Sequence, residues 1–300
     1  EEQLTYLGFS YGTAIGAWYA ELFPKRVRAL VLDGAVDLRL SAVELAFEQA
    51  AGFERALASY FDFCGQARNN CSWTGDRTPQ EEFARLSAAV DAMSLAVRGG
   101  DRPVGPGEFL LGVIAPLYGG TSGFRSISSA LAAAQGGDGS ALLAITDSYL
   151  NRRMNGSYGN ITEANAAVNC LDKPVPSYDA LRAEQTRFAT ASPTFGLPVL
   201  TGTFICAHWP VRPTPPAAPK GAGAAPIVVI GTRGDPATPY AWAEALAADL
   251  ESAVLLTYEG EGHTAYGRGG PCIADAVNAY LIEGKVPGEG TSCPAVGSTM

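Results

Sequence analysis

The hydrophobic residues near the start of the chain change from a continuous run to helical spacing and back. The run Leu4–Phe9 predicts a short buried strand, and residues 27–32 predict a second one. Between them, apolar residues recur at the spacing of one helix face: Ile15, Trp18, Tyr19 and Leu22. Pro24 ends that helix. A strand, a helix and a strand with short connections form the βαβ unit of a parallel sheet.

From about residue 38 to residue 191, the chain carries long Ala-rich stretches at helical spacing. The clearest predicted helices cover residues 41–63, 79–97, 107–117 and 140–153, and no strand pattern there is convincing. A Pro- and Ala-rich linker follows, and then residues 227–230 and 254–258 again predict buried strands. Each of these strands precedes a further helical pattern.

These patterns predict an α/β fold in which a parallel sheet is interrupted by a large helical insertion. We expect residues 1–37 to form the first part of the sheet layer and residues 38–210 to form the insertion. Residues 211–225 would be the linker, and residues 226–300 the second part of the sheet layer. The insertion has the size of a domain in its own right.

Composition and charge exclude several classes of partner. The formal net charge of −9 would repel a polyanion, so no nucleic-acid partner is expected. The longest apolar runs fall far short of the ~20 residues that a membrane span needs, so no span is expected.

The even number of cysteines favours disulfides. Pairing in sequence order is the most economical choice among about 15 connectivities, and six free thiols are the alternative. Disulfides would point to an exported protein, secreted or in the cell envelope. With two histidines and no C-x-x-C, neither a zinc site nor any other metal or cofactor is expected. The predicted pairs are Cys64–Cys71, Cys170–Cys206 and Cys272–Cys293.

Residues 8–12 match the pattern G-x-S-x-G between a predicted strand and a predicted helix. In that context the pattern predicts a nucleophile elbow, a sharp turn that exposes the hydroxyl of Ser10. The backbone N–H of Tyr11, at the start of the helix, would donate to the oxyanion. The alternative interpretation is an ordinary glycine turn.

A serine nucleophile needs a general base, and the chain offers two histidines. His263 follows the predicted strand 254–258, at the sheet edge where open α/β sheets place their active sites. His208 lies beside a predicted disulfide and before the linker, so a structural role is favoured for it. We therefore predict His263 as the base.

The base needs a buried carboxylate to orient it. Asp235 follows the strand 227–230, and the order Ser10, Asp235, His263 is the chain order of α/β-hydrolases. Asp33, at the end of the strand 27–32, is the alternative, although capping the turn at Gly34 is the favoured role for it. Thr238 would either hydrogen-bond the triad or simply begin the next helix.

Several motifs together resemble the tripeptidyl aminopeptidases, exported relatives of the prolyl aminopeptidases within the α/β-hydrolases. They are GFSYGT at 8–13, NCLD at 169–172, CAHWP at 206–210, DPATP at 235–239, GHT at 262–264 and the tail at 290–293. The resemblance implies an α/β-hydrolase with a helical lid that releases short peptides from free N-termini. The substrate would be a peptide with a free N-terminus.

An aminopeptidase must also bind a substrate ammonium, which calls for carboxylates or carbonyls. Candidates within the insertion are Glu163, Asn169 and Asp172, and a solvated helix face is the equally weighted alternative. An esterase or lipase would use the same triad with an apolar groove instead. The third hypothesis is an inactive or purely binding hydrolase-like fragment.

The sequence departs from the family at its start. The family has an N-terminal segment with further strands and a His-Gly-Gly-type loop, whereas this chain opens on the predicted nucleophile strand. We expect that segment of the same protein as a partner that supplies the second oxyanion donor. Without it, the chain is expected to aggregate and to turn over about a hundredfold more slowly or worse.

Overall fold

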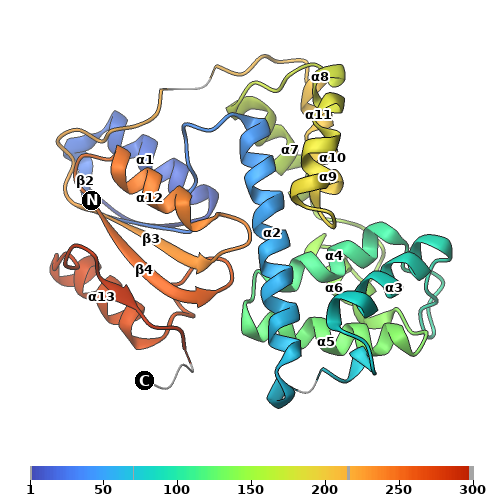
Figure 1. Ribbon diagram of the computed structural model, residues 1–300. Coiled ribbons are helices and arrows are strands. Elements are labelled where there is room, and N and C mark those ends of the chain that lie inside the picture. The colour runs from blue at the N-terminus through green and yellow to red at the C-terminus, as the bar shows by residue number, and fades with distance from the viewer. Residues whose placement is uncertain (1, 70, 215–216, 297–300) are drawn as a thin grey trace. The chain divides into compact units, whose positions relative to one another are not determined.

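A computed structural model describes residues 2–69, 71–214 and 217–296. Its centre is a sheet in the order β1-β2-β3-β4-β5, and every neighbouring pair is parallel (Figure 1). The predicted parallel sheet is therefore confirmed. The strand β5 is two residues long, too short for the sequence pattern to predict. The five strands are Leu4–Phe9, Val27–Asp33, Ile227–Gly234, Ala253–Glu261 and Ser292–Cys293.

Helices cover both faces of this sheet (Figure 1). The helices α1 (Tyr11–Leu22) and α12 (Tyr240–Asp249) pack on one face, against Leu30, Leu32 and Val229. The helix α13 (Gly270–Glu283) packs on the other face, against residues that include Val31 and Ile230. Successive strand residues point to opposite faces, so one continuous apolar strand serves both layers.

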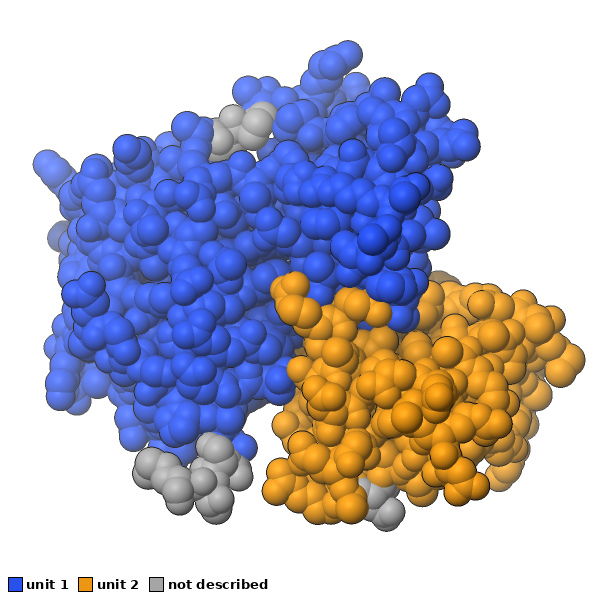
Figure 2. Space-filling view, in the orientation of Figure 1, with its two compact units in different colours: residues 1–52, 170–300 blue, residues 53–169 orange. Residues whose placement is uncertain are grey.

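The chain divides into two compact units, coloured separately in Figure 2. The first unit comprises Glu1–Gly52 and Cys170–Met300 and contains the sheet, and the second comprises Phe53–Asn169. Residues 38–52 and 170–210 thus fall in the unit that holds the sheet, whereas the sequence pattern places them in the insertion. Residues 215 and 216 of the predicted linker lie outside the described residues.

The first unit also contains further helices, most of which follow β2 in the chain. The apolar side chains of Leu181, Phe188 and Leu200 form a small core with Val43 and Ala50 of α2. The helices here are the first part of α2 (Ala42–Gly65), the end of α7 (Ile161–Asp172), α8 (Tyr178–Ala183), α9 (Gln185–Ala191), α10 (Gly196–Gly202), α11 (Phe204–Ala207) and the 3-10 turn η1 (Pro24–Arg26).

The second unit is helical and has an aromatic core of its own. Tyr60, Trp73 and Phe109 are fully buried, and the rings of Tyr60 and Trp73 are stacked with their centroids 6.2 Å apart. Its elements, beside the rest of α2 and α7, are η2 (Ala67–Asn69), η3 (Ser72–Thr74), α3 (Pro79–Ala92), α4 (Pro106–Leu117), α5 (Thr121–Gln135) and α6 (Ser140–Tyr149).

The cysteines pair in sequence order, as predicted. The S–S distances are 2.07 Å for Cys64–Cys71, 1.93 Å for Cys170–Cys206 and 1.97 Å for Cys272–Cys293. The second bridge joins the end of α7 to α11, and the third joins α13 to β5. Within the described ranges, no helix is both long and apolar enough to cross a membrane.

The bridge between α13 and β5 should stabilise the edge of the sheet. It closes a loop with a sequence separation of 21, for which chain entropy predicts about 3 kcal/mol of stability. We expect the double substitution Cys272→Ser/Cys293→Ser to speed amide hydrogen exchange in β5 and α13. Cys64→Ser/Cys71→Ser, in the other unit, is the matched control and should leave that exchange unchanged. Equal protection of β5 in both variants would contradict the prediction.

Candidate active site

Ser10 lies in a strained turn between β1 and α1. Its backbone has φ 53° and ψ −119°, a conformation that residues with a side chain rarely adopt and that costs about 1–3 kcal/mol. The hydroxyl of Thr13 donates to the Ser10 carbonyl at 2.7 Å and helps to hold the turn. A Cβ on Gly8 would come within 2.5 Å of the Gly12 carbonyl oxygen, so glycine is required there. The geometry is that of the predicted elbow.

Asp235 follows β3 in a loop that saturates its carboxylate with donors. The residue is 4% exposed, and the backbone N–H groups of Ala237 and Thr238 donate to Oδ1 at 2.9 and 2.8 Å. The hydroxyl of Thr238 donates to Oδ2 at 3.0 Å, and the N–H of Thr264 donates to the same oxygen at 3.2 Å. These donors fix the carboxylate in one orientation.

His263 follows β4 and meets that carboxylate. Its Nδ1 lies 3.0 Å from each oxygen of Asp235 and 3.3 Å from the Thr238 hydroxyl. The Asp235 contact favours the tautomer with hydrogen on Nδ1, which leaves Nε2 as the proton acceptor. The His263 side chain is 11% exposed, so the imidazole is largely shielded from water.

Asp33 ends β2, and its carboxylate also reaches the loop that carries His263. The backbone N–H of Ala265 donates to both oxygens at 3.0 Å, and the N–H of Tyr266 donates to Oδ2 at 2.7 Å. The main-chain carbonyl of Asp33 accepts the Ser10 N–H at 2.9 Å. The side chain was expected to cap the turn at Gly34, and it instead binds the loop after the histidine.

The electrostatics of Asp33 differ from those of an ordinary surface carboxylate. Burial raises the pKa of Asp33 to about 6, and the like charge of Asp235 adds to the rise. The N–H groups of Tyr266 and Ala265 and the nearby His263 act in the opposite direction. The site therefore contains two fully buried carboxylate groups beside one imidazole.

The turn around His263 is strained at the next residue, Thr264. Thr264 has φ 66°, in the left-handed region that β-branched residues avoid. The guanidinium of Arg268 donates to the carbonyl oxygens of His263 and Thr264, and burial lowers the pKa of Arg268. The carboxylates of Asp33 and Asp235 interact favourably with that guanidinium.

Gly34 brings β2 close to the imidazole. A Cβ on Gly34 would lie 3.1 Å from His263 Cε1 and 3.2 Å from the Thr238 hydroxyl, and its φ of 70° also favours glycine. The loops after β1, β2, β3 and β4 therefore converge at one edge of the sheet.

The three candidates for the substrate ammonium fall in different surroundings. Burial raises the pKa of Tyr11, the residue after Ser10, to about 12, and the nearby carboxylate of Asp172 adds to the rise. Glu163 and Asn169 belong to the second unit and are exposed there, and the Asn169 amide donates to Asn165 at 2.9 Å. Only Asp172 of these three shares the unit of Ser10.

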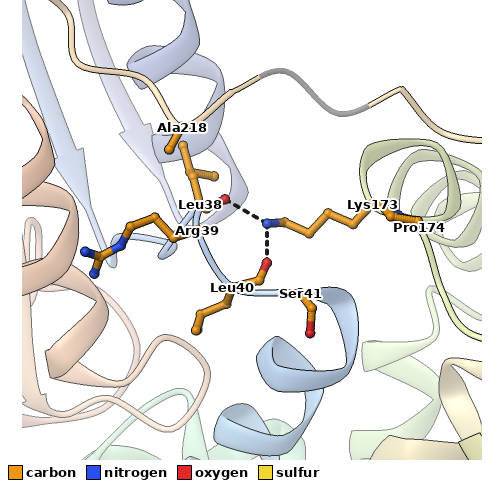
Figure 3. Close-up of a pocket in the computed structure, with 7 residues that line it drawn as sticks. All are labelled: Leu38, Arg39, Leu40, Ser41, Lys173, Pro174 and Ala218. Atoms are coloured by element: carbon orange, nitrogen blue, oxygen red, sulfur yellow. Dashed lines mark hydrogen bonds between the residues drawn. The ribbon is translucent and has the colours of Figure 1, made fainter.

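A pocket of about 360 Å³ lies beside this segment (Figure 3). Lys173 extends across it and donates to the carbonyl oxygens of Leu38 and Leu40 at 2.9 and 2.5 Å. Burial lowers the pKa of Lys173. The pocket is lined by Leu38, Arg39, Leu40, Ser41, Lys173, Pro174 and Ala218, and none of the residues 10, 235 and 263 lines it.

The second histidine has a different environment. His208 ends α11, and its ring lies 6.0 Å from that of Tyr178. Across the described part of the chain, no group of three or more His, Cys, Asp and Glu side chains could hold a metal ion.

Sequence reasoning named Asp33 only as an alternative carboxylate and did not name Arg268, although both bind the loop around His263. The clamp of Asp33 on the His263 loop was not foreseen, although a buried strand that ends in Asp-Gly was a visible signal. Arg268 stands in a Gly-rich stretch without apolar periodicity, and no local pattern distinguishes it.

Comparisons with known proteins agree with this geometry. Residues 1–103 match the family described as alpha/beta hydrolase fold, and residues 192–293 match the family described as TAP-like protein. The chain therefore belongs to the α/β-hydrolases. Within them it belongs to the group that contains the tripeptidyl aminopeptidases.

Three relatives illustrate this group. The chain is 37% identical to serine protease Hip1 of Mycobacterium tuberculosis over 98% of its own length and 58% of the relative's. It is 36% identical to carboxylesterase B of the same species, over 91% and 53% of the two lengths. It is 30% identical to the tripeptidyl aminopeptidase of Streptomyces lividans, over 98% and 55%. The chain thus spans little more than half the length of these relatives.

The Thr238 hydroxyl should matter for turnover through its bond to Asp235. Thr238→Val keeps the shape and removes a hydrogen bond to a buried charge, a loss of about 1.5–3 kcal/mol. We expect kcat to fall about ten- to a hundredfold. Thr232→Val on β3 is the matched control, because the Thr232 hydroxyl is buried without a hydrogen-bond partner in the described structure. Equal kcat values for the two variants would refute a role for Thr238.

Proposed function

We propose that this chain carries the catalytic triad of a serine peptidase, with Ser10 as nucleophile, His263 as general base and Asp235 as its orienting carboxylate. The observation that carries the proposal is the 3.0 Å contact between His263 Nδ1 and the buried Asp235, at the same sheet edge as the strained Ser10. A carboxylate, an imidazole and a serine in this chain order are typical of α/β-hydrolases.

The proposed reaction is acyl transfer through a covalent intermediate. His263 takes the proton from Ser10 as the hydroxyl oxygen attacks the carbonyl carbon of the substrate, and Asp235 stabilises the imidazolium. His263 then protonates the leaving amine as the C–N bond breaks. Water attacks the acyl-enzyme with His263 again as base, which releases the acid and restores Ser10.

The oxyanion of the tetrahedral intermediate needs preorganised donors. Tyr11 is the first residue of α1, where backbone N–H groups have no partner inside the helix. We propose the Tyr11 N–H as one donor, supported by its position directly after Ser10.

For the substrate, we propose a peptide with a free N-terminus from which short peptides are released. The relatives named serine protease and tripeptidyl aminopeptidase support this class. Asp172 is the best-supported ammonium-binding residue, because its carboxylate lies near enough to Tyr11, the neighbour of the proposed nucleophile, to raise the pKa of the Tyr11 hydroxyl. Glu163 and Asn169 are further candidates from the second unit. The helices between the two halves of the sheet would act as a lid.

An esterase is the second candidate function. The relative named carboxylesterase B is specific support for it, since the same triad cleaves esters. The three disulfides further support a protein that works outside the cytoplasm, secreted or in the cell envelope.

The triad assignment predicts which histidine is essential. In the full-length protein, Ser10→Ala and His263→Ala should each lower kcat by about 10⁴-fold or more, because nucleophile and base act as one unit. His208→Ala is the matched control and should retain most of the wild-type kcat. Loss of turnover in folded His208→Ala, with turnover retained in His263→Ala, would overturn the assignment.

The two substrate classes can be separated with one pair of compounds. A tripeptide anilide with a free amine should be cleaved faster than its N-acetylated form. The lost charge-assisted contact corresponds to about 1.5–3 kcal/mol, or roughly ten- to a hundredfold in kcat/KM. Asp172→Asn should erase most of this difference. Equal rates on both anilides, with fast cleavage of acyl esters, would favour the esterase.

A further inference from the structure

The loop that carries His263 adopts a conformation that is costly for its sequence. Thr264 directly follows the imidazole and has φ 66°, whereas β-branched residues strongly avoid positive φ. A residue in the left-handed region costs of order 1–3 kcal/mol and persists only where its surroundings enforce it. Something in the neighbouring structure must therefore hold this turn.

The hydrogen bonds around Thr264 show what holds it. Asp235 accepts the Thr264 N–H on the strand side of the turn. On the other side, the next two N–H groups, of Ala265 and Tyr266, both end on the carboxylate of Asp33. The Asp33 side chain is 0% exposed, so these bonds form away from competing water.

Asp33 is also attached to the nucleophile. Its main-chain carbonyl accepts the Ser10 N–H at 2.9 Å, and its neighbour Gly34 lies against the imidazole. One residue therefore contacts the backbones of both the elbow and the base loop. The register of the sheet accounts for this, because Asp33 pairs with Phe9 on one side and with Ile230 on the other.

We propose that Asp33 is a positioning residue for the general base: its carboxylate clamps the strained turn at Thr264 and so sets the position of His263 relative to Ser10. This role rests on the triad assigned above. It differs from the triad role of Asp235, because the Asp33 carboxylate accepts hydrogen bonds from the backbone of the loop.

Three charged or titratable groups interact with the buried carboxylate of Asp33. Asp235 repels it, while His263 and the guanidinium of Arg268 attract it. Burial raises the pKa of Asp33 from 3.8 to about 6. The pKa of Asp33 is higher in the folded state than in the unfolded state, so ionisation of Asp33 destabilises the fold. The free energy of unfolding therefore falls as the pH rises from about 4 through about 6.

Substitutions at Asp33 separate the clamp from the charge. Asp33→Asn keeps one oxygen, which can occupy the place of Oδ2 and accept both N–H groups, whereas Asp33→Ala removes the clamp. Since the amide has no charge to bury, Asp33→Asn should melt no lower than the wild type at pH 7.5. Asp37→Asn is the matched control, because Asp37 is also buried and its carboxylate contacts Arg39 instead.

The experiment measures how fast a fluorophosphonate labels Ser10 in the full-length protein, because this rate needs the triad but no particular substrate. We expect Asp33→Ala to lower the labelling rate constant about a hundredfold, the usual cost of a misplacement of about 1 Å. Asp33→Asn should stay within about tenfold of the wild type, and Asp37→Asn within about threefold. A merely structural role would lower the labelled fraction and leave the rate constant of the folded protein unchanged.

A double-mutant cycle tests the strain itself. Glycine adopts positive φ freely, so Thr264→Gly removes the backbone strain at residue 264. The turn should then keep its conformation without the hydrogen bonds to Asp33. The variant Asp33→Ala/Thr264→Gly should regain about tenfold or more of the lost rate, and Thr264→Gly alone should stay within about threefold of the wild type. If Asp33→Ala does not fold, Asp33→Asn and Asp33→Asn/Thr264→Gly form the same cycle.

The outcomes distinguish this proposal from the proposed function. If the wild type is not labelled at Ser10, the triad assignment fails. If the wild type is labelled and folded Asp33→Ala is labelled at the same rate, the positioning role is wrong. Strictly additive effects of the two substitutions would also overturn it, because the clamp and the strain would then be independent.

Discussion

The arrangement of this site depends on the parallel register of four neighbouring strands. In a parallel sheet every strand ends at the same edge, so the loops that follow the strands meet there. Phe9 pairs with Asp33, Asp33 pairs with Ile230, and Gly234 pairs with Glu261. The residues one or two positions further along are Ser10, Gly34, Asp235 and His263. A shift of any strand by one residue would turn its side chains to the opposite face and dissolve the site.

Two strained turns and two buried carboxylates accompany this convergence. Ser10 and Thr264 both have positive φ without being glycine; Ser10 is the proposed nucleophile, and Thr264 directly follows the proposed base His263. The carboxylates of Asp33 and Asp235 bind backbone N–H groups of the neighbouring loops. A buried carboxylate without partners would destabilise the fold. Here the backbone N–H groups of the loops stabilise the two carboxylates, and the same hydrogen bonds order the loops. The backbone strain is thus located beside the residues of the proposed triad, whose relative positions must be held.

The sequence allowed much of the sheet to be predicted, together with the placement of residues 10, 235 and 263 directly behind its strands. Short apolar runs identify β1 to β4. The signal reflects burial on both faces for β2 and β3, whereas in β1, predicted as a buried strand, only Gly8 is buried because β1 is the edge strand of the described sheet. The Ser10, Asp235 and His263 motifs lie directly behind these runs, so their meeting at one edge follows from sheet geometry. The helix α5 was missed because its serines, alanines and glycine give a weak periodic signal.

Other features depend on tertiary contacts that no local pattern encodes. The strand β5 forms two residue pairs with β4, and its position depends on the Cys272–Cys293 bridge and on that pairing. Asp33 binds a loop that is more than 200 residues away along the chain. Arg268 binds carbonyl oxygens only four and five residues before it, but a turn that brings them together leaves no periodic pattern in the sequence. The boundaries between the two compact units could not be predicted from the sequence. Each boundary falls inside a helix, α2 or α7, where the helical spacing continues without a break.

The second unit has its own aromatic core and its own disulfide, Cys64–Cys71, and the first unit retains every residue that shapes the triad. Mutations inside residues 53–169 can therefore accumulate without repacking the sheet or its loops. This separation leaves the helical insertion free to vary in sequence while residues 10, 33, 235 and 263 keep their local surroundings.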